Sequence, residues 1–222
     1  MSWNPTGWVA LVLTSLVSGQ NLPAAPDKPA IVFVHGIFDS GQKMAWMAAK
    51  FRAKGHETFC PDLTPAHGGK SLPELSSQLD AKILARFGAR RRLVVVGFSM
   101  GGLVTRHWLQ NHATLDRIAG FVTIGSPHNG SLLAHAWPFP GGADMRPGSP
   151  FLQSLQIGDE RLVPLAPLSL YTPLDLMILP AWSSQWPIAE TRPVWVPAHP
   201  LLVFSPEVVR HIEAYIRKNA GE

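Results

Sequence analysis

Apolar residues along this chain fall into short continuous runs separated by segments with a helical pattern. The runs at 30–34, 92–96 and 118–124 contain almost no polar residue after their first position. Runs of this kind are typical of strands buried on both faces of a parallel sheet. Shorter strands are expected at 56–60, 168–171 and 194–196.

Helices are expected between these strands. One is predicted at about 42–54, ending at Gly55, and another at about 103–112. Ser71 and Glu74 have the spacing of a capping box and open a helix that runs to about Phe87. The last helix begins after Ser205, with Pro206 at its first position. Strands alternating with helices predict an α/β fold with a mostly parallel sheet of about six strands.

The pattern indicates one main domain at 30–222, preceded by an N-terminal extension at 1–29. Between 131 and 168 the regular alternation gives way to Trp, Pro and Gly, which predicts a lid or cap insertion. The apolar run at 8–17 is too short to span a bilayer. We expect it to pack on the domain, with a signal peptide or anchor as the alternative. A cytoplasmic location is favoured, and that alternative would make the protein secreted or membrane-associated.

Charge and cysteine content exclude several kinds of protein. The net charge is +4, and its only tight cluster, Arg90–Arg92, is typical of a solvated loop. Because no basic stripe with interleaved aromatics is present, we expect no nucleic-acid partner. Cys60 is the only cysteine, and no HExxH or CxxC motif occurs, so neither an intrachain disulfide nor a metal site is expected. The mild basicity leaves room for a transient contact with an anionic lipid surface.

The sequence Gly97-Phe98-Ser99-Met100-Gly101 matches the nucleophile-elbow motif G-x-S-x-G. An expected strand ends just before it and an expected helix starts just after it, which is the context that the motif requires. The glycines relieve crowding in a turn tight enough to expose the serine hydroxyl. A Gly-rich phosphate loop is the alternative, but the additional glycines or the Lys-Ser/Thr ending of such loops are missing. The motif therefore predicts that Ser99 is a nucleophile.

A second motif, His35-Gly36-Ile37, follows the first buried strand. In folds with a nucleophile elbow, this loop supplies one N–H of the oxyanion hole, and the residue after the serine supplies the other. We therefore predict that the backbone N–H groups of Ile37 and Met100 form the oxyanion hole. The His35 side chain is expected to hold the loop by hydrogen bonding.

The order of such sites along the chain is serine, acid, then histidine. His199 lies between the last expected strand and the last helix, whereas His211 lies within that helix, so His199 is the predicted base. Asp175 follows the preceding strand and is the predicted acid, although an Asx turn or a helix cap would also explain it. The rival acids Asp144, Asp159 and Glu160 all precede that strand.

These motifs resemble those of bacterial lipases and esterases of the α/β-hydrolase superfamily, and they are similar to the small triacylglycerol lipases. The resemblance covers about residue 30 to the end of the chain. It rests on five stretches of sequence: Val34–Ile37, Gly97–Gly102, Thr123–Ser131, Arg146–Leu152 and Pro197–Val208. It implies an α/β-hydrolase fold, the triad Ser99–Asp175–His199 and the oxyanion amides of Ile37 and Met100. Larger relatives carry longer lids, and some bind calcium, but this sequence offers no calcium ligand set.

The expected function is hydrolysis of carboxylic esters, including fatty esters, through an acyl-enzyme intermediate and without a cofactor. A thioesterase or amidase with the same triad is the alternative, followed by a non-catalytic lipid-binding protein. Phe38 and His128 are candidate substrate contacts, although a structural role is favoured for His128. Aromatic residues after 132 either form an acyl-binding cap or fill the core: Trp137, Phe139, Phe151, Trp182 and Trp186. The oligomeric state is not predicted.

Overall fold

The computed structural model describes Met1 and residues 28–220. The apolar run at 8–17 lies outside these residues. The described chain contains one sheet of six parallel strands in the order β2-β1-β3-β4-β5-β6. This confirms the predicted fold class. The strands are β1 (Ala30–Val34), β2 (Thr58–Phe59), β3 (Leu93–Phe98), β4 (Ile118–Ile124), β5 (Leu168–Tyr171) and β6 (Glu190–Pro193).

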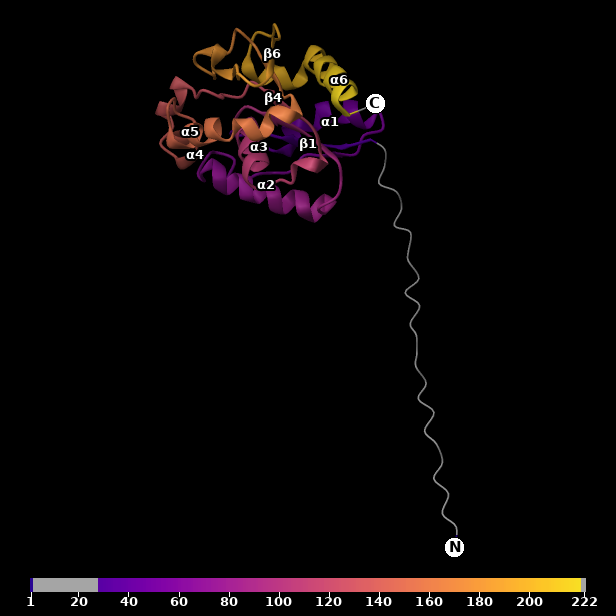
Figure 1. The fold of residues 1–222 in the computed structure, drawn as a ribbon. Coiled ribbons are helices and arrows are strands. Elements are labelled where there is room, and N and C mark those ends of the chain that lie inside the picture. Colours follow the sequence, from indigo (N-terminus) through magenta and orange to yellow (C-terminus); the bar gives the residue numbers. More distant parts are fainter. Residues whose placement is uncertain (2–27, 221–222) are drawn as a thin grey trace.

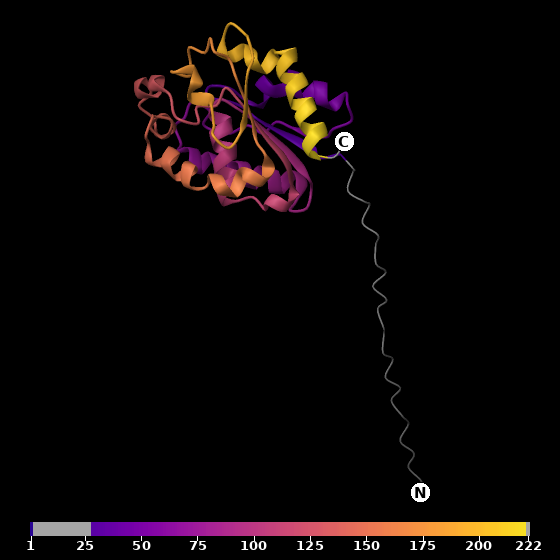
Figure 2. The ribbon, with the colours of Figure 1, turned by 45° about the horizontal axis from the view of Figure 1, so that its top comes forward.

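Helices cover both faces of this sheet (Figures 1 and 2). The helices α2 (Leu72–Phe87) and α3 (Met100–Asn111) cover one face, and α1 (Ala45–Arg52) and α6 (Pro206–Ala220) cover the other. Alternate residues of a strand point to opposite faces. In β1, Val32 therefore packs under α2 and α3, while Phe33 packs under α1 and α6. Both layers are apolar, which explains the continuous apolar runs of the central strands.

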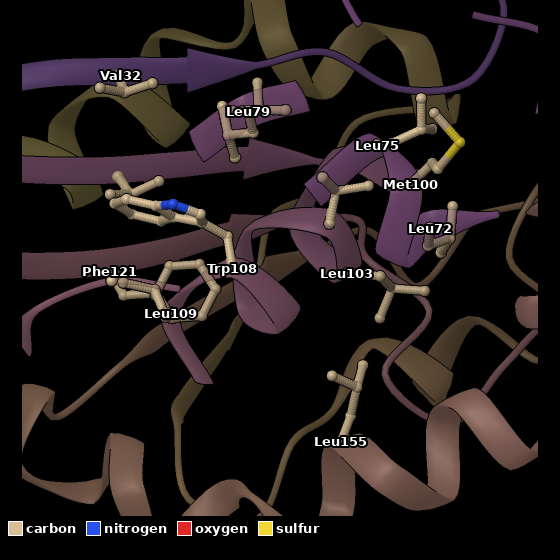
Figure 3. Close-up of a cluster of buried hydrophobic side chains, with 14 of the residues drawn as sticks. Val32, Leu72, Leu75, Leu79, Met100, Leu103, Trp108, Leu109, Phe121 and Leu155 are labelled. Carbon is tan, nitrogen blue, oxygen red and sulfur yellow. The ribbon is translucent and has the colours of Figure 1, made fainter. Parts of the chain in front are cut away.

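The core beneath α2 and α3 is centred on Trp108, whose side chain is fully buried (Figure 3). It lies against Phe121 of β4 and shares its cluster with leucines of α2, among them Leu79. The indole N–H donates to the Asp80 carboxylate at 2.9 Å, so the one polar atom of this ring is satisfied. This packing fixes α3 on the sheet.

Segment 131–168 contains more helix than its irregular sequence pattern predicted. It forms α4 (Pro140–Asp144), α5 (Pro150–Ile157) and the 3-10 helices η3 (Leu132–Ala136) and η4 (Asp159–Leu165). Helices of five to eight residues show too few turns for a helical period to be visible in the sequence. The role of this segment as a lid stays a prediction.

The last strand was predicted at the wrong residues. It was expected at 194–196, but β6 spans Glu190–Pro193, and the chain turns after it through a Val196 N–H to Val194 carbonyl bond of 3.0 Å. The strand lies at the edge of the sheet, and its residues are mostly exposed. An edge strand with polar residues lacks the apolar run by which buried strands are recognised.

A buried charge lies on the side of α3 away from Trp108. Arg106 has 1% of its side chain exposed and forms an ion pair with Asp159 of η4, in which its Nη2 and Nε both donate to the Asp159 Oδ1, at 2.6 and 3.1 Å. The Trp186 indole N–H also donates to Asp159, at 2.9 Å. Burial lowers the pKa of Arg106, and the neighbouring Asp159 opposes that shift. The pair fastens η4 to α3.

We predict that Asp159→Ala lowers the free energy of unfolding by about 3–5 kcal/mol, because it leaves the Arg106 charge buried without its partner. Denaturant unfolding followed by circular dichroism measures this loss. Glu190→Ala is the control, since it breaks a pair with Arg192 in which both side chains are about half exposed. The control should lose no more than about 1 kcal/mol. Equal losses in the two variants would contradict the prediction.

Candidate active site

Ser99 joins β3 to α3 in a left-handed backbone conformation, with φ of 54°. This conformation is costly for a residue with a side chain and persists only where neighbouring structure enforces it. Two backbone bonds do so: the Ser99 N–H donates to Ile124 at 2.8 Å, and the Gly102 N–H donates to the Ser99 carbonyl at 3.0 Å. The serine therefore stands on a rigid turn between strand and helix.

The glycines of this turn allow the helix to approach the sheet directly. A Cβ on Gly97 would lie 2.5 Å from the Gly102 Cα, and a Cβ on Gly101 would lie 2.4 Å from the His35 carbonyl oxygen. A Cβ on Gly36, in the loop after β1, would lie 3.0 Å from the Ser99 Cβ. The loop after β1 and the turn at Ser99 are thus in close contact because these residues lack side chains.

Asp175 and His199 meet in the interior, although 24 residues separate them. The His199 Nδ1 lies 2.6 Å from the Asp175 Oδ2, and the two residues are 5% and 3% exposed. A carboxylate oxygen only accepts, so Nδ1 carries the proton and Nε2 is left to accept one. This is the tautomer that a general base needs.

Both members of this pair are held by their surroundings. The Asp175 Oδ1 accepts the N–H groups of Met177 at 2.8 Å and Ile178 at 2.9 Å. The His199 ring packs on the Phe98 ring, the residue before Ser99, with centroids 4.8 Å apart. On another side it meets Gly125, where a Cβ would lie 2.9 Å from the His199 Cε1. The ring contact with Phe98 thereby places His199 next to the turn at Ser99.

The rival residues are engaged elsewhere. Asp144 accepts the Leu72 N–H at the start of α2 at 2.7 Å, and Asp159 pairs with Arg106. Glu160 is exposed on η4. His211, on α6, lies 3.7 Å from Glu207 one helical turn away. The structure therefore brings Asp175, and none of the rival acids, to His199.

Two backbone N–H groups, those of Ile37 and Met100, were expected to bind an oxyanion, and neither donates to an acceptor within the described residues. Met100 begins α3, so its N–H is one of the unpaired donors of a helix N-terminus. His35 holds the neighbouring loop, as expected. Its Nε2 accepts the Leu63 N–H at 2.9 Å, and its Nδ1 donates to the Gly36 carbonyl at 2.8 Å.

A pocket of about 240 Å³ opens at Ser99. Its walls are almost entirely apolar and come from the loop after β1, the residues around η3 and the loop after Asp175. They are Ile37, Phe38, Ser99, Pro127, Ser131, Leu133, Ala134, Ala136, Trp137, Met145, Met177 and Ile178. Ile37, Phe38, Ser99 and Trp137 had been named from the sequence. The other wall residues were missed, because nothing in an irregular segment indicates which of its apolar side chains share a face.

The aromatic residues after 132 divide between the two roles left open for them. Trp137 lines the pocket, and its ring meets the Phe38 ring edge-on with centroids 4.8 Å apart. Phe139 does not line the pocket, and its ring centroid lies 5.3 Å from that of Trp137. Phe151 and Trp186 are buried in the core, and Trp182 is largely exposed. Of the five, only Trp137 lines this pocket, and an acyl-binding role for it stays a prediction.

The two candidate substrate contacts also lie in different environments. Phe38 lines the pocket and is 58% exposed. His128 is buried, lies 3.0 Å from the Thr123 hydroxyl and 3.2 Å from Arg106, and stacks on Trp186. Burial and the Arg106 charge hold the pKa of His128 well below its usual value. It does not line the pocket, and its position favours the structural alternative.

No group of three or more His, Cys, Asp or Glu within the described residues could hold a metal ion. Burial raises the pKa of the Cys60 thiol to about 11, so this thiol stays protonated at neutral pH and is no competing nucleophile. In the described part of the chain, no helix is both long and apolar enough to cross a membrane.

Comparison with known proteins places this arrangement in a wider group. A family model described as the alpha/beta hydrolase fold matches residues 29–192. A comparison with curated proteins finds no match. Among solved structures, the mature lipase BlEst2 of Bacillus licheniformis aligns with a TM-score of 0.72 and 19% identity, covering 89% of this chain and 96% of that one.

A second similar structure is a pyrethroid hydrolase from Sphingobium faniae, with a TM-score of 0.59, 16% identity and coverage of 87% of this chain and 99% of that one. A third is the lin2722 gene product of Listeria innocua, with a TM-score of 0.64, 15% identity and coverage of 86% of this chain and 94% of that one. At these identities, the likeness establishes the shared fold.

We predict that Gly101→Ala lowers the free energy of unfolding by about 3 kcal/mol, since the new methyl group would meet backbone oxygens of Val34 and His35 that cannot move without disturbing the sheet. Denaturant unfolding measures the loss. Gly158→Ala is the control, because its methyl group would meet only the Gln110 side chain. A Gly101→Ala protein as stable as the control would show that the helix is not held against β1 as described.

Proposed function

Because the chain belongs to the alpha/beta hydrolase family, we propose that it is a serine hydrolase that cleaves carboxylic esters with apolar acyl groups. Ser99 is the nucleophile, His199 the general base and acid, and Asp175 the residue that orients His199. The backbone N–H groups of Ile37 and Met100 stabilise the oxyanion. The observation that carries the proposal is the buried 2.6 Å contact between Asp175 and His199, beside a serine at the mouth of an apolar pocket.

The proposed reaction proceeds in two steps. His199 Nε2 takes the Ser99 proton as the hydroxyl oxygen attacks the ester carbonyl carbon, and the resulting imidazolium is stabilised by Asp175. The tetrahedral intermediate collapses, the alcohol leaves with the proton from His199, and the acyl group stays on Ser99. His199 then takes a proton from water, whose oxygen attacks the acyl carbon. The second tetrahedral intermediate collapses as the bond to the Ser99 oxygen breaks, His199 returns the proton to that oxygen, and the acid is released.

Support for an apolar acyl group comes from the pocket walls. Hydrocarbon side chains from three segments meet at Ser99, among them Ile37, Ala134 and Ile178. Such a surface gains free energy by covering an alkyl chain and offers few partners to a polar one. The small side chain of Ala134, which is 8% exposed, leaves part of this volume open.

We predict that Ser99→Ala abolishes hydrolysis of p-nitrophenyl butyrate, with a fall in kcat of at least about 10,000-fold. The reason is that the variant lacks the hydroxyl oxygen that takes the acyl group in the first step. Release of p-nitrophenolate measures the rate. Ser126→Ala is the matched control: this nearby serine is also buried, and its hydroxyl has no hydrogen-bond partner within the described residues.

The control variant should keep the rate of the unaltered protein. An unaltered protein that hydrolyses neither this ester nor a thioester or anilide, and that a fluorophosphonate does not label at Ser99, would contradict the proposal. That outcome would favour a binding protein with the same fold.

We predict that Ala134→Leu shifts the substrate preference towards short esters. The added carbons would occupy pocket volume, so kcat/KM for p-nitrophenyl octanoate should fall roughly tenfold or more relative to the butyrate. The two rates are measured with the same preparation. Ala143→Leu is the control, since Ala143 is exposed on α4 and does not line the pocket. An unchanged ratio in Ala134→Leu would show that the acyl chain lies elsewhere.

A further inference from the structure

Ser131 lies where two pocket-forming segments meet. It is 4% exposed and precedes η3, and its Oγ accepts the Leu133 N–H at 3.3 Å as a helix cap does. The same Oγ accepts the Leu179 N–H at 3.0 Å and donates to the Met177 carbonyl at 3.0 Å. These two partners are 48 and 46 residues away in the sequence. A cap accounts for the first bond, but not for the other two.

The remote partners of Ser131 belong to the loop that holds the Asp175 carboxylate. Met177 donates its N–H to Asp175 Oδ1 at 2.8 Å, while its carbonyl accepts from Ser131. The Leu132 N–H, next to Ser131, donates to the Leu179 carbonyl at 2.8 Å. The loop at 175–179 is therefore fixed on one side by the carboxylate and on the other by the segment at 131–132.

The position of Asp175 determines how His199 is held. The Asp175 Oδ2 accepts a hydrogen bond from the His199 Nδ1–H at 2.6 Å. A movement of the loop would therefore change the length and angle of this bond to the imidazole. A hydrogen bond this short depends steeply on distance and angle. Met177 and Ile178 also line the pocket, as does Ser131 itself.

We propose that Ser131 is a positioning residue: its hydroxyl fixes the loop that carries Asp175, and through Asp175 it sets the tautomer and orientation of His199. This inference rests on the proposed function, since it assigns Ser131 a part in the same reaction. Ser131 touches none of the reacting atoms. Its effect is expected on kcat rather than on KM, because replacing a hydroxyl by hydrogen hardly alters the apolar walls.

The test compares Ser131→Ala, Ser131→Thr and Ser169→Ala. Ser169 is the matched control, because it is buried on β5, the strand that precedes the acid loop, and its hydroxyl donates to the Ser184 carbonyl at 2.7 Å. Kinetics with p-nitrophenyl butyrate give kcat and KM. Nitrogen-15 NMR of the imidazole rings, assigned with His199→Gln, gives the tautomer of His199 without any substrate. Circular dichroism establishes that each variant is folded at the temperature used.

We expect Ser131→Ala to lower kcat by roughly 10-fold to 100-fold, with KM changed by less than about twofold. Its His199 nitrogen shifts should move from the Nδ1–H tautomer towards a mixture of tautomers. Ser131→Thr keeps the hydroxyl and should restore both the kcat and the nitrogen shifts. Ser169→Ala should leave both unchanged.

Three results would overturn the proposal. The first is a Ser131→Ala protein with an unchanged kcat and unchanged His199 shifts. The second is a loss of kcat with unchanged His199 shifts, which would indicate that Ser131 acts on the pocket alone. The third is an equal loss in Ser169→Ala. If the unaltered protein hydrolyses no ester, the proposed function fails, and the nitrogen shifts then decide the role of Ser131 by themselves.

Discussion

The contact of α3 with the sheet, glycine against backbone, is the constraint on which the rest of the site depends. Gly97, Gly101 and Gly102 leave no side chain between the helix and the strands, so the turn between them becomes very short. A turn this short requires the left-handed conformation of Ser99. The cost of that conformation is met by the burial of Trp108 and its neighbours, which hold the helix down. Packing far from the serine thereby maintains the strained geometry at the serine.

The fold could be predicted where burial on both faces removes polar residues from a strand. This holds for β1, β3 and β4, which lie in the middle of the sheet. It fails for β6, because the sequence Glu190–Pro193 is exposed at the edge and resembles a loop in composition. The short helices between 131 and 168 were missed for a related reason: they are fixed by contacts with distant parts of the chain, such as that between Asp159 and Arg106.

In the candidate site, too, the features with a local sequence pattern could be predicted, and those that depend on distant segments could not. Ser99 could be recognised from five consecutive residues, since the glycines that make room for the elbow are its neighbours in the sequence. Asp175 and His199 could be chosen by their order after the expected strands, and the structure places them in contact. The pocket walls and the hydrogen bonds of Ser131 could not be predicted. They depend on how loops far apart in the sequence face one another, and no local pattern records that.

The strand order also has a consequence for how the site is assembled during synthesis. The sheet extends outward from β3 through β4 and β5 to β6, in the order in which the ribosome delivers these strands. Ser99 follows the central strand β3, whereas Asp175 and His199 follow the two outermost strands on that side. A nascent chain that has folded only as far as β4 carries Ser99 without Asp175 and His199. The buried contact between these two residues therefore forms late, when the C-terminal part of the chain docks on the finished sheet.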